Sequence, residues 1–457
     1  MLARKRIHVK KPKQIGPLIR NLTKDSVSIV LYGHGKSKHI SYGVVYIVEM
    51  DLTIVKPLNK VNFYCERFEI NDLESDKTYT YLCGIFHLKH PYNDDPLTYR
   101  KSFYNYFKTP KESSSTYTFA FGSCRFFLNF FGYGVTAGLS DKPFKTLNKL
   151  LDKGYPIESM FMIGDSIYMD VVKWLPVRLK SLSSMRRLHC AARSTSGFKN
   201  LASKIEFKEV PDDHEYRDNG NEMIYIKNSK SYRNAIRAIN IFESSRAPHS
   251  LNAHVEYWEF FERSGIPIFM SDTRYERWID GMRIGIYGED QMLQLKRRLK
   301  QYKNSGLPFI WFSQIPFVLQ NGGDDNFSHY EEDQHDLIEY IVDCNIKNIF
   351  ILTGDSHAST SARFKIYKND QDTGCTIVEI MSSGIYQLSH DKPKSFTNTL
   401  VAGEYTLKTD ESLEEVQNSI ISKDNFCVVH ANTDEKTIEA TFFESNGKMI
   451  RKDTYDF

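Results

Sequence analysis

Several apolar, strand-like segments of the chain end in residues that can ligate metal ions or transfer protons. In chain order these residues are Ser123 and Cys124 after TFAFG, Asp165 after MFMIG, Asp212, Asp213 and His214 after FKEVP, Asp272 and Arg274 after IPIFMS, and Asp355 and His357 after NIFILTG. Crowded carboxylates repel one another and are costly to desolvate unless cations neutralise them. Since carboxylate oxygen, imidazole nitrogen and thiolate sulfur are all metal ligands, the residue types predict a metal centre.

A cluster of two or more metal ions suits in-line displacement at phosphorus. The ions clamp the phosphoryl oxygens and convert a bound water into hydroxide near neutral pH. Arg274 can then hold a phosphate oxygen through bidentate hydrogen bonds. The residue types therefore suit displacement at phosphorus by a metal-bound water. A metal-bridging hydroxide would attack phosphorus, and no phospho-enzyme is expected.

The segments that carry these residues alternate with helical patterns, which indicates an α/β core. Residues 141–154, DKPFKTLNKLLDKG, predict a helix with Asp141 as a possible N-cap, Pro143 near its start and Gly154 as its stop. Two further apolar stripes at helical spacing run through Met292, Leu295 and Leu299 and through Leu337, Tyr340, Ile341 and Cys344. Ligands of such sheets bind at the carboxyl ends of the strands, so one rim is expected to carry the candidate residues.

The first 112 residues have a different pattern. SVSIVLYG, YGVVYIVEMDLTIV, KTYTYLCGIFHL and SFYNYFKT are rich in β-branched and aromatic residues, and no helical period of useful length interrupts them. These segments predict a small β-sandwich domain over residues 1–112. TPKESSST, residues 109–116, is expected to be a linker, and residues 113–457 are expected to form the catalytic domain.

Size and composition exclude several classes of protein. The 457 residues, of which 41% are hydrophobic, are enough for a large core and for more than one domain. The 60 basic and 57 acidic residues give a net charge of +3, so nucleic acid is not expected as the main partner. Seven cysteines without a CxxC pair indicate reduced thiols. With no secretory h-region and no apolar run of ~18 residues, a cytoplasmic protein without a transmembrane segment is expected.

Five motifs occur in the order typical of one family. GSC, GDSIY, PDDHE, SDTR and GDSHAS resemble the SC, GDxIY, DDHE, DTR and GDxH motifs of the PhoD-like metallophosphoesterases, the alkaline phosphatase D family. QMLQLKRRLK and LPFIWFSQIPF are similar to a further family segment, and the N-terminal strands resemble the family's N-terminal β domain. The resemblance implies a four-layer αββα sandwich preceded by a small all-β domain of immunoglobulin or fibronectin III type. It also implies phosphomonoesterase or phosphodiesterase activity, often with iron and calcium.

The resemblance also assigns roles to single residues. Metal ligands would be Cys124, Asp165, Tyr168, Asp213, Asp355 and His357, with Asp165 bridging the ions and Cys124 and Tyr168 on an iron-type ion. His214 and Arg274 would act on the substrate, His214 by protonating the leaving oxygen or holding a phosphate oxygen. Residues expected around this set are Asp212, which can also be a ligand, Ser123 and Ser356. The substrate would be a phosphorylated small molecule or a diester.

Other interpretations of the same residues stay open at this stage. The protein can be a selective phosphodiesterase of a lipid, nucleotide or polymer, or a non-catalytic metal-binding or interaction module. Cys124 can be a buried apolar cysteine, Tyr168 a packing residue, and Arg274 can pair with Asp272 alone. The acidic loop NGGDDNF is expected to be solvated, as is the basic segment 173–208, which can alternatively attract an anionic substrate.

Overall fold

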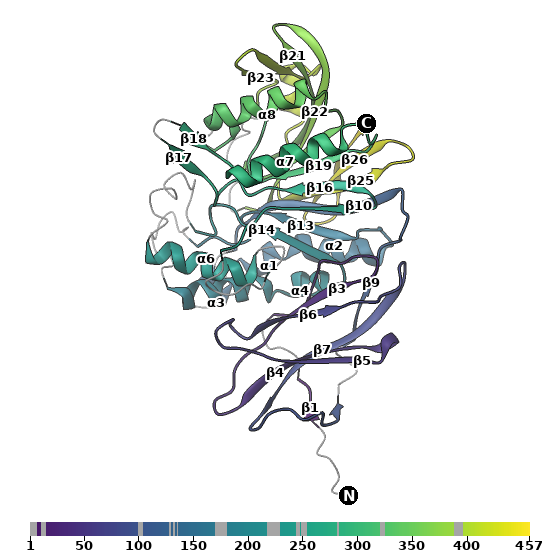
Figure 1. Ribbon diagram of the computed structural model, residues 1–457, viewed down its shortest axis with the longest axis vertical. Helices are drawn as coiled ribbons and strands as arrows, with labels where there is room; N and C mark the ends of the chain where they lie inside the picture. The colour runs from purple at the N-terminus through teal and green to yellow at the C-terminus, as the bar shows by residue number, and fades with distance from the viewer. Residues whose placement is uncertain are drawn as a thin grey trace, which may run out of the picture.

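The computed structural model describes residues 7–10, 15–98, 104–127, 129–130, 133–134, 136–169, 181–216, 229–243, 247, 254–280, 283–319, 325–387 and 396–457. The elements stack in layers along the long axis of the molecule (Figure 1). The N-terminal strands lie at one end, and β21 (Ser359–Lys368) and β23 (Thr399–Ala402) lie at the other (Figure 1).

The first part of the chain forms two antiparallel sets of strands that face each other. One sheet contains, in spatial order, β5 (Leu52–Pro57), β4 (Ile40–Ile47), β7 (Thr78–Leu88) and β9 (Tyr104–Lys108). The facing strands are β2 (Leu18–Arg20), β3 (Val27–Tyr32) and β6 (Cys65–Ile70). Ile29 and Phe68 pack in one buried cluster with Val45 and Tyr81 of the first sheet. The two sets of strands thus pack face to face, while a separate N-terminal all-β domain ending at residue 112 stays a prediction.

The rest of the chain forms two sheets that meet at β10 (Thr116–Arg125). In the first sheet β10 lies between antiparallel β25 (Asn425–Asn432) and parallel β13 (Ser159–Ile163), and β14 (Glu206–Val210) follows β13. β26 (Thr437–Glu444) and β27 (Met449–Asp456) extend it beyond β25. In the second sheet the parallel strands are β16 (Ile266–Met270), β19 (Phe309–Ser313), β20 (Ile349–Thr353) and β22 (Gln371–Tyr386). The end of β10 also pairs with the end of β22 at Ser123 and Ser383, so both sheets end at one rim.

Further strands complete the second sheet and the loops. β15 (Glu259–Arg263) pairs with β16, while β21 pairs with β22 and with β24 (Tyr405–Lys408), which also pairs with β23. β1 (Ile7–His8) pairs with β8 (Leu97–Thr98), β11 (Asn129–Phe130) with β12 (Tyr133–Gly134), and β17 (Trp278–Asp280) with β18 (Arg283–Gly285). Short helices are η1 (Val48–Met50), α1 (Ala137–Ser140), η3 (Phe327–Tyr330) and α9 (Leu413–Asn418).

Longer helices cover the outer faces of the two sheets. α2 (Lys142–Asp152) and α4 (Ser196–Ala202) pack Phe144 and Phe198 against Phe207 of the first sheet. α7 (Glu289–Tyr302) and α8 (Glu331–Asp343) pack against Trp311 of the second. Between the sheets, the rings of Phe161 and Phe312 stack with centroids 4.6 Å apart. The four-layer αββα sandwich expected from the sequence is therefore confirmed.

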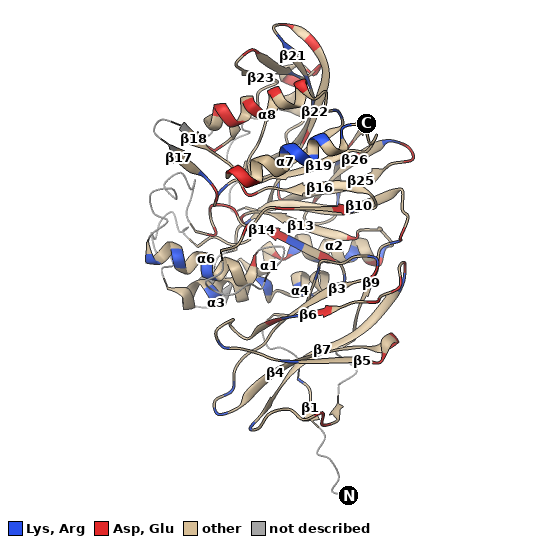
Figure 2. Ribbon diagram, in the orientation of Figure 1, with Lys and Arg blue, Asp and Glu red and all other residues tan. Residues whose placement is uncertain are grey.

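α3 (Leu182–Arg193) and α6 (Lys230–Phe242) lie beside each other at the side of the first sheet (Figure 1). Both helices contain Lys or Arg residues, while α8 is rich in Asp and Glu (Figure 2). The expectation that the basic segment 173–208 is a solvated face is wrong for two of its cations. Arg193 and Lys208 are buried and ion-paired, Arg193 with Glu209 and Glu243 and Lys208 with Glu259. Residues 173–180 of that segment lie outside the described residues.

All seven cysteines are free thiols, as expected from their spacing. None of the described helices has the length and hydrophobicity that crossing a membrane requires.

Candidate metal centre

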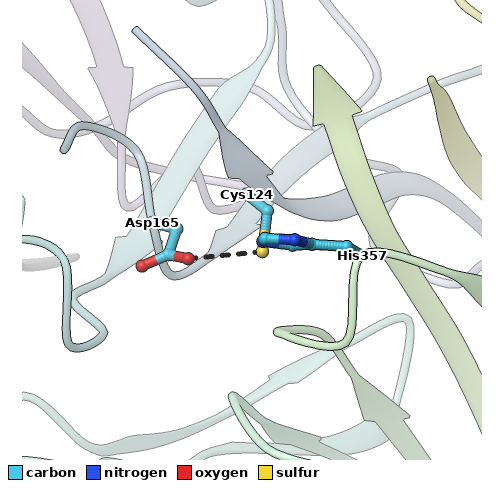
Figure 3. Close-up of side chains that lie close together, drawn as sticks. All are labelled: Cys124, Asp165 and His357. Carbon is cyan, nitrogen blue, oxygen red and sulfur yellow. Dashed lines mark hydrogen bonds between the residues drawn. The ribbon is translucent and has the colours of Figure 1, made fainter. Parts of the chain in front are cut away.

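The ends of β10, β13, β14 and β20 bring the predicted ligands to one place. Three groups of side chains have ligand atoms that all lie within 4.8 Å of one another. These groups are Cys124, Asp165 and His357; Asp165, Asp213 and His214; and Asp165, Asp212, Asp213 and Asp355. Figure 3 shows the side chains of the first group pointing toward one another from three separate segments. Asp165 belongs to every group, which is the placement that a bridging ligand requires.

The backbone turns sharply at these positions. Cys124, Asp165, Asp355 and His357 all have positive φ, at 58°, 52°, 60° and 53°. This left-handed region is uncommon for residues other than glycine, and such strain clusters at functional sites. Gly164 precedes Asp165 with φ 106°, and a side chain there would collide with the Cβ of Asp212. Glycine at 164 therefore lets the turn that carries Asp165 lie directly against Asp212.

Asp165 accepts hydrogen bonds from both a thiol and a phenol. The sulfur of Cys124 lies 3.3 Å from Asp165 Oδ2, the contact drawn in Figure 3, and the hydroxyl of Tyr168 donates to the same oxygen at 3.1 Å. Burial raises the pKa of the Cys124 thiol to about 12 and that of the Tyr168 phenol well above its usual value. Burial, Cys124 and Asp213 raise the pKa of Asp165 well above its usual range. Nearby cations would reverse these shifts, because they favour the charged forms.

Arg274 lies among four carboxylates and is fully buried. Its guanidinium donates to Asp212 and Asp325, and its Nη2 lies 3.9 Å from Asp213 and 3.6 Å from Asp355. Burial alone would lower the pKa of Arg274, but these carboxylates outweigh it and raise the pKa well above its usual value. Arg274 therefore stays cationic at the rim.

The interpretation that Arg274 pairs with Asp272 alone is wrong. Asp272 accepts the backbone N–H of Arg274 at 2.9 Å, and the guanidinium reaches the other acids instead.

The expectation that the acidic loop NGGDDNF is solvated is wrong for Asp325. This residue is only 8% exposed and pairs with both Arg274 and Arg277. Asp324 of that loop lies outside the described residues. No local pattern distinguishes Asp325 in the sequence, because its partners come from the loop after β16, about 50 residues earlier in the chain.

The remaining predicted residues also lie at the rim. His214 is buried, and its ring centroid is 4.1 Å from that of Tyr168. The hydroxyl of Ser123 lies 3.2 Å from the sulfur of Cys124. Ser356 is buried, and among the described residues its hydroxyl has no hydrogen-bond partner. The structure thus brings all the predicted side chains together, and their individual roles stay predictions.

Three residues at the site were not predicted. Fully buried Glu215 accepts the backbone N–H groups of Asp165 at 3.2 Å, Ile167 at 3.3 Å and Asp212 at 2.8 Å, so it joins two ligand-bearing loops. Gln387 donates to the Tyr168 hydroxyl at 2.9 Å, and Ser383 contacts the sulfur of Cys124 at 3.2 Å. Glu215 directly follows the predicted His214, which is a usable signal. Ser383 and Gln387 carry no such signal.

The donor set fits metal ions. Thiol, imidazole and carboxylate in the first group suit a transition metal, whereas the four carboxylates suit a hard cation that prefers oxygen ligands. Asp212 Oδ2 is buried and has no hydrogen-bond partner among the described residues. Since buried polar atoms are normally paired, this oxygen fits the role of a metal ligand. Burial raises the pKa of Asp212 to about 6 even though Arg274 opposes this.

The fold of the chain is shared with solved structures of two other proteins. No protein-family model matches the chain, and no curated protein matches its sequence. Among solved structures, PhoD has a TM-score of 0.69 at 17% identity, over 98% of this chain and 91% of that one. A purple acid phosphatase, PPD1 from yellow lupin (Lupinus luteus) seeds, has a TM-score of 0.59 at 13% identity, over 96% of this chain and 73% of that one. The resemblance to PhoD-like proteins is therefore confirmed at the level of the fold.

Proposed function

We propose that the protein is a metal-dependent hydrolase of phosphoric esters. The observation that carries the proposal is the convergence of Asp165 with three sets of thiol, imidazole and carboxylate ligands at one rim. The fold supports it, because the purple acid phosphatase that shares this fold is by name a phosphatase. Arg274 supports it further, since a guanidinium beside these ligands can hold a phosphoryl oxygen.

Two chemically different metal positions follow from the donor atoms. Cys124, Tyr168, Asp165 and His357 would hold a transition metal, with iron as the expected ion. Asp165, Asp212, Asp213 and Asp355 would hold a harder cation such as calcium. Bound there, the ions supply positive charge for the phosphoryl oxygens and an activated water for in-line attack.

The chain's own groups bind the ester and assist departure of the leaving group. The guanidinium of Arg274 stays charged and holds a phosphoryl oxygen through Nη2, which has no hydrogen-bond partner among the described residues. His214 donates a proton to the leaving oxygen, and the ring of Tyr168 fixes the orientation of its imidazole. Asp355, with 20% of its side chain exposed, and His357 are the less buried members of the ligand groups. The substrate therefore approaches from their side of the rim.

Asp165→Asn and Asp213→Asn test the proposal. Each change removes a carboxylate charge from the cluster at nearly constant shape. Turnover of a generic phosphomonoester and a matched diester should fall about 100-fold or more, because loss of a transition-state charge contact costs this much. Metal content is measured on the same samples. The control is Asp434→Asn, an exposed acid far from the rim in the turn after β25.

Wild-type turnover in both variants would contradict the proposal. The ratio of monoester to diester turnover in the wild-type enzyme then decides between a general phosphatase and a selective phosphodiesterase.

A further inference from the structure

Ser383 lies near the end of β22, fully buried beside the candidate metal centre. Its hydroxyl oxygen accepts the backbone N–H of His357 at 2.8 Å and lies 3.2 Å from the sulfur of Cys124. A serine hydroxyl carries one hydrogen. Because the N–H of His357 points at the oxygen, that hydrogen is available to the sulfur, and Ser383 donates to Cys124.

Ser123 makes the same pair of contacts from β10. Its hydroxyl accepts the backbone N–H of Asp355 at 3.1 Å and lies 3.2 Å from the sulfur of Cys124. Two hydroxyls from two strands therefore donate to one sulfur, and each also holds an amide of the loop that carries Asp355 and His357. The pairing of Ser123 with Ser383 between β10 and β22 fixes this arrangement.

Gln387, the residue after β22, makes a similar pair of contacts near the Tyr168 phenol. The side-chain amide of Gln387 donates to the backbone carbonyl of Cys124 at 3.1 Å and to the hydroxyl oxygen of Tyr168 at 2.9 Å. One short segment, residues 383–387, thus contacts all three non-carboxylate residues proposed as ligands of the transition metal, at the Cys124 sulfur, the Tyr168 hydroxyl and the backbone N–H of His357. Such outer contacts orient metal ligands and tune them electronically.

We propose that Ser383 is a positioning residue that sets the strength of the Cys124 sulfur as a metal ligand. The inference rests on the proposed function only in assuming a metal at Cys124. A hydrogen bond withdraws electron density from a ligating sulfur and fixes its direction. The same hydroxyl ties the sulfur to His357, so the two ligands keep one relative position.

Co²⁺ binding to the purified protein measures this effect directly. In Ser383→Ala the dissociation constant for Co²⁺ should rise about 10–100-fold, because Cys124 and His357 lose the contact that holds them in one relative position, and this outweighs the gain in electron density on the sulfur. The sulfur-to-cobalt charge-transfer band should move to longer wavelength, because a sulfur that has lost a donor holds its electrons less tightly. Ser382→Ala is the matched control. Ser382 is equally buried on the same strand, but its hydroxyl donates to the backbone carbonyl of Phe121 at 3.4 Å.

A second pair of variants separates the hydroxyl from packing. Ser383→Thr keeps the hydroxyl. Ser383→Val has the same shape as the threonine variant but carries a methyl group in place of the hydroxyl. Threonine should keep the wild-type band position and valine should show the alanine shift. Equal bands in the two variants, or a wild-type spectrum in Ser383→Ala, would overturn the role of Ser383.

Absence of a cobalt band that depends on Cys124, tested with Cys124→Ala, would overturn it as well. Ester turnover is assayed separately. A protein that hydrolyses no ester but shows the Ser383 shift refutes the proposed function and leaves this inference standing.

Discussion

At the scale of single residues, the buried acids of the site are balanced by buried arginines, Arg274 above all. Arg274 contacts Asp212 and Asp325 directly and lies near two further carboxylates. Removing one partner of a buried ion pair leaves the other charge uncompensated, which costs more than the pair itself contributes. The arginine therefore supports the fold as well as the proposed binding of phosphate.

We expect Arg274→Met to lower the free energy of unfolding by about 3–5 kcal/mol, since Asp212 loses its counter-ion and Asp325 keeps only Arg277. Urea denaturation of metal-free protein measures this. Lys296→Met is the control, because Lys296 and Asp336 form a pair with 19% and 49% of their side chains exposed. Such a pair contributes about 1 kcal/mol or less. Equal losses in the two variants would contradict the expectation.

Glu158 offers a test of pH dependence away from the metal ligands. Burial raises its pKa from 4.5 to about 7, against the lowering effect of the backbone N–H of Thr118 and of Arg263. The folded chain thus keeps a proton on Glu158 that the unfolded chain releases. Its contribution to stability is present below pH ~4.5 and is lost as the pH rises toward 7.

As the pH rises from about 4.5 to about 7, the free energy of unfolding of the wild-type protein should fall by about 1–3 kcal/mol relative to that of Glu158→Gln. The difference in unfolding free energy between the two proteins, measured in urea from pH 5 to 8, isolates this group because the other titrations cancel. A difference that does not change with pH would refute the assignment.

At the scale of elements, tight turns after the strands place the ligands. Gly164 and Gly154 both have positive φ, at 106° and 88°, but only at Gly164 would a side chain meet another residue, Asp212. Alanine at either position strains the backbone by about 1–3 kcal/mol. Only Gly164→Ala should also move Asp165 away from Asp212.

We therefore expect both glycine variants to lose stability and only Gly164→Ala to lose metal affinity, by about 10-fold or more. Isothermal titration with Co²⁺ compares the two. Unchanged affinity in Gly164→Ala, or an equal loss in Gly154→Ala, would show that the turn does not position Asp165.

Strand ends explain how much of the site could be predicted. Cys124, Asp165 and Asp355 follow apolar runs directly, so strand pattern and polarity were enough to place them at one rim. Asp325, Ser383 and Gln387 reach the rim through pairings between segments far apart in the chain, such as β10 with β22, which no local pattern encodes.

Local signals can also point to the wrong partner. Asp141 was expected to cap the helix that begins beside it, and α2 does begin at Lys142. Its carboxylate instead accepts the backbone N–H groups of Gly197 and Phe198 at 2.8 and 2.9 Å, in the first turn of α4. Helix starts attract carboxylates equally well from a neighbouring segment, so sequence alone identified the residue type and not its helix.

At the scale of the whole molecule, the N-terminal strands share a buried ion network with the core. Arg20 of β2 is fully buried and donates to Glu209 at 2.6 Å and to the backbone carbonyls of Phe207 and Phe242 at 3.0 and 3.2 Å. Glu209 also binds Arg193, which pairs with Glu243 at 3.0 Å. β2 and β14 also pair at Ile19 and Glu206. Buried ion pairs therefore connect the parts of the chain on the two sides of the boundary predicted at residue 112.

We expect the protein to unfold in urea as one cooperative unit. All four tryptophans, Trp174, Trp258, Trp278 and Trp311, follow residue 112, so their fluorescence reports on the core alone, whereas far-UV circular dichroism reports on both parts. The two transitions should coincide, since neither part can open without breaking the buried pair of Arg20 with Glu209. Arg20→Met should lower the midpoint of both signals together, at a cost of about 3–5 kcal/mol. Lys24→Met, which removes an exposed pair with Glu112, should leave both unchanged. A fluorescence transition separate from the dichroism transition in the wild-type protein would instead establish residues 1–112 as an independent domain.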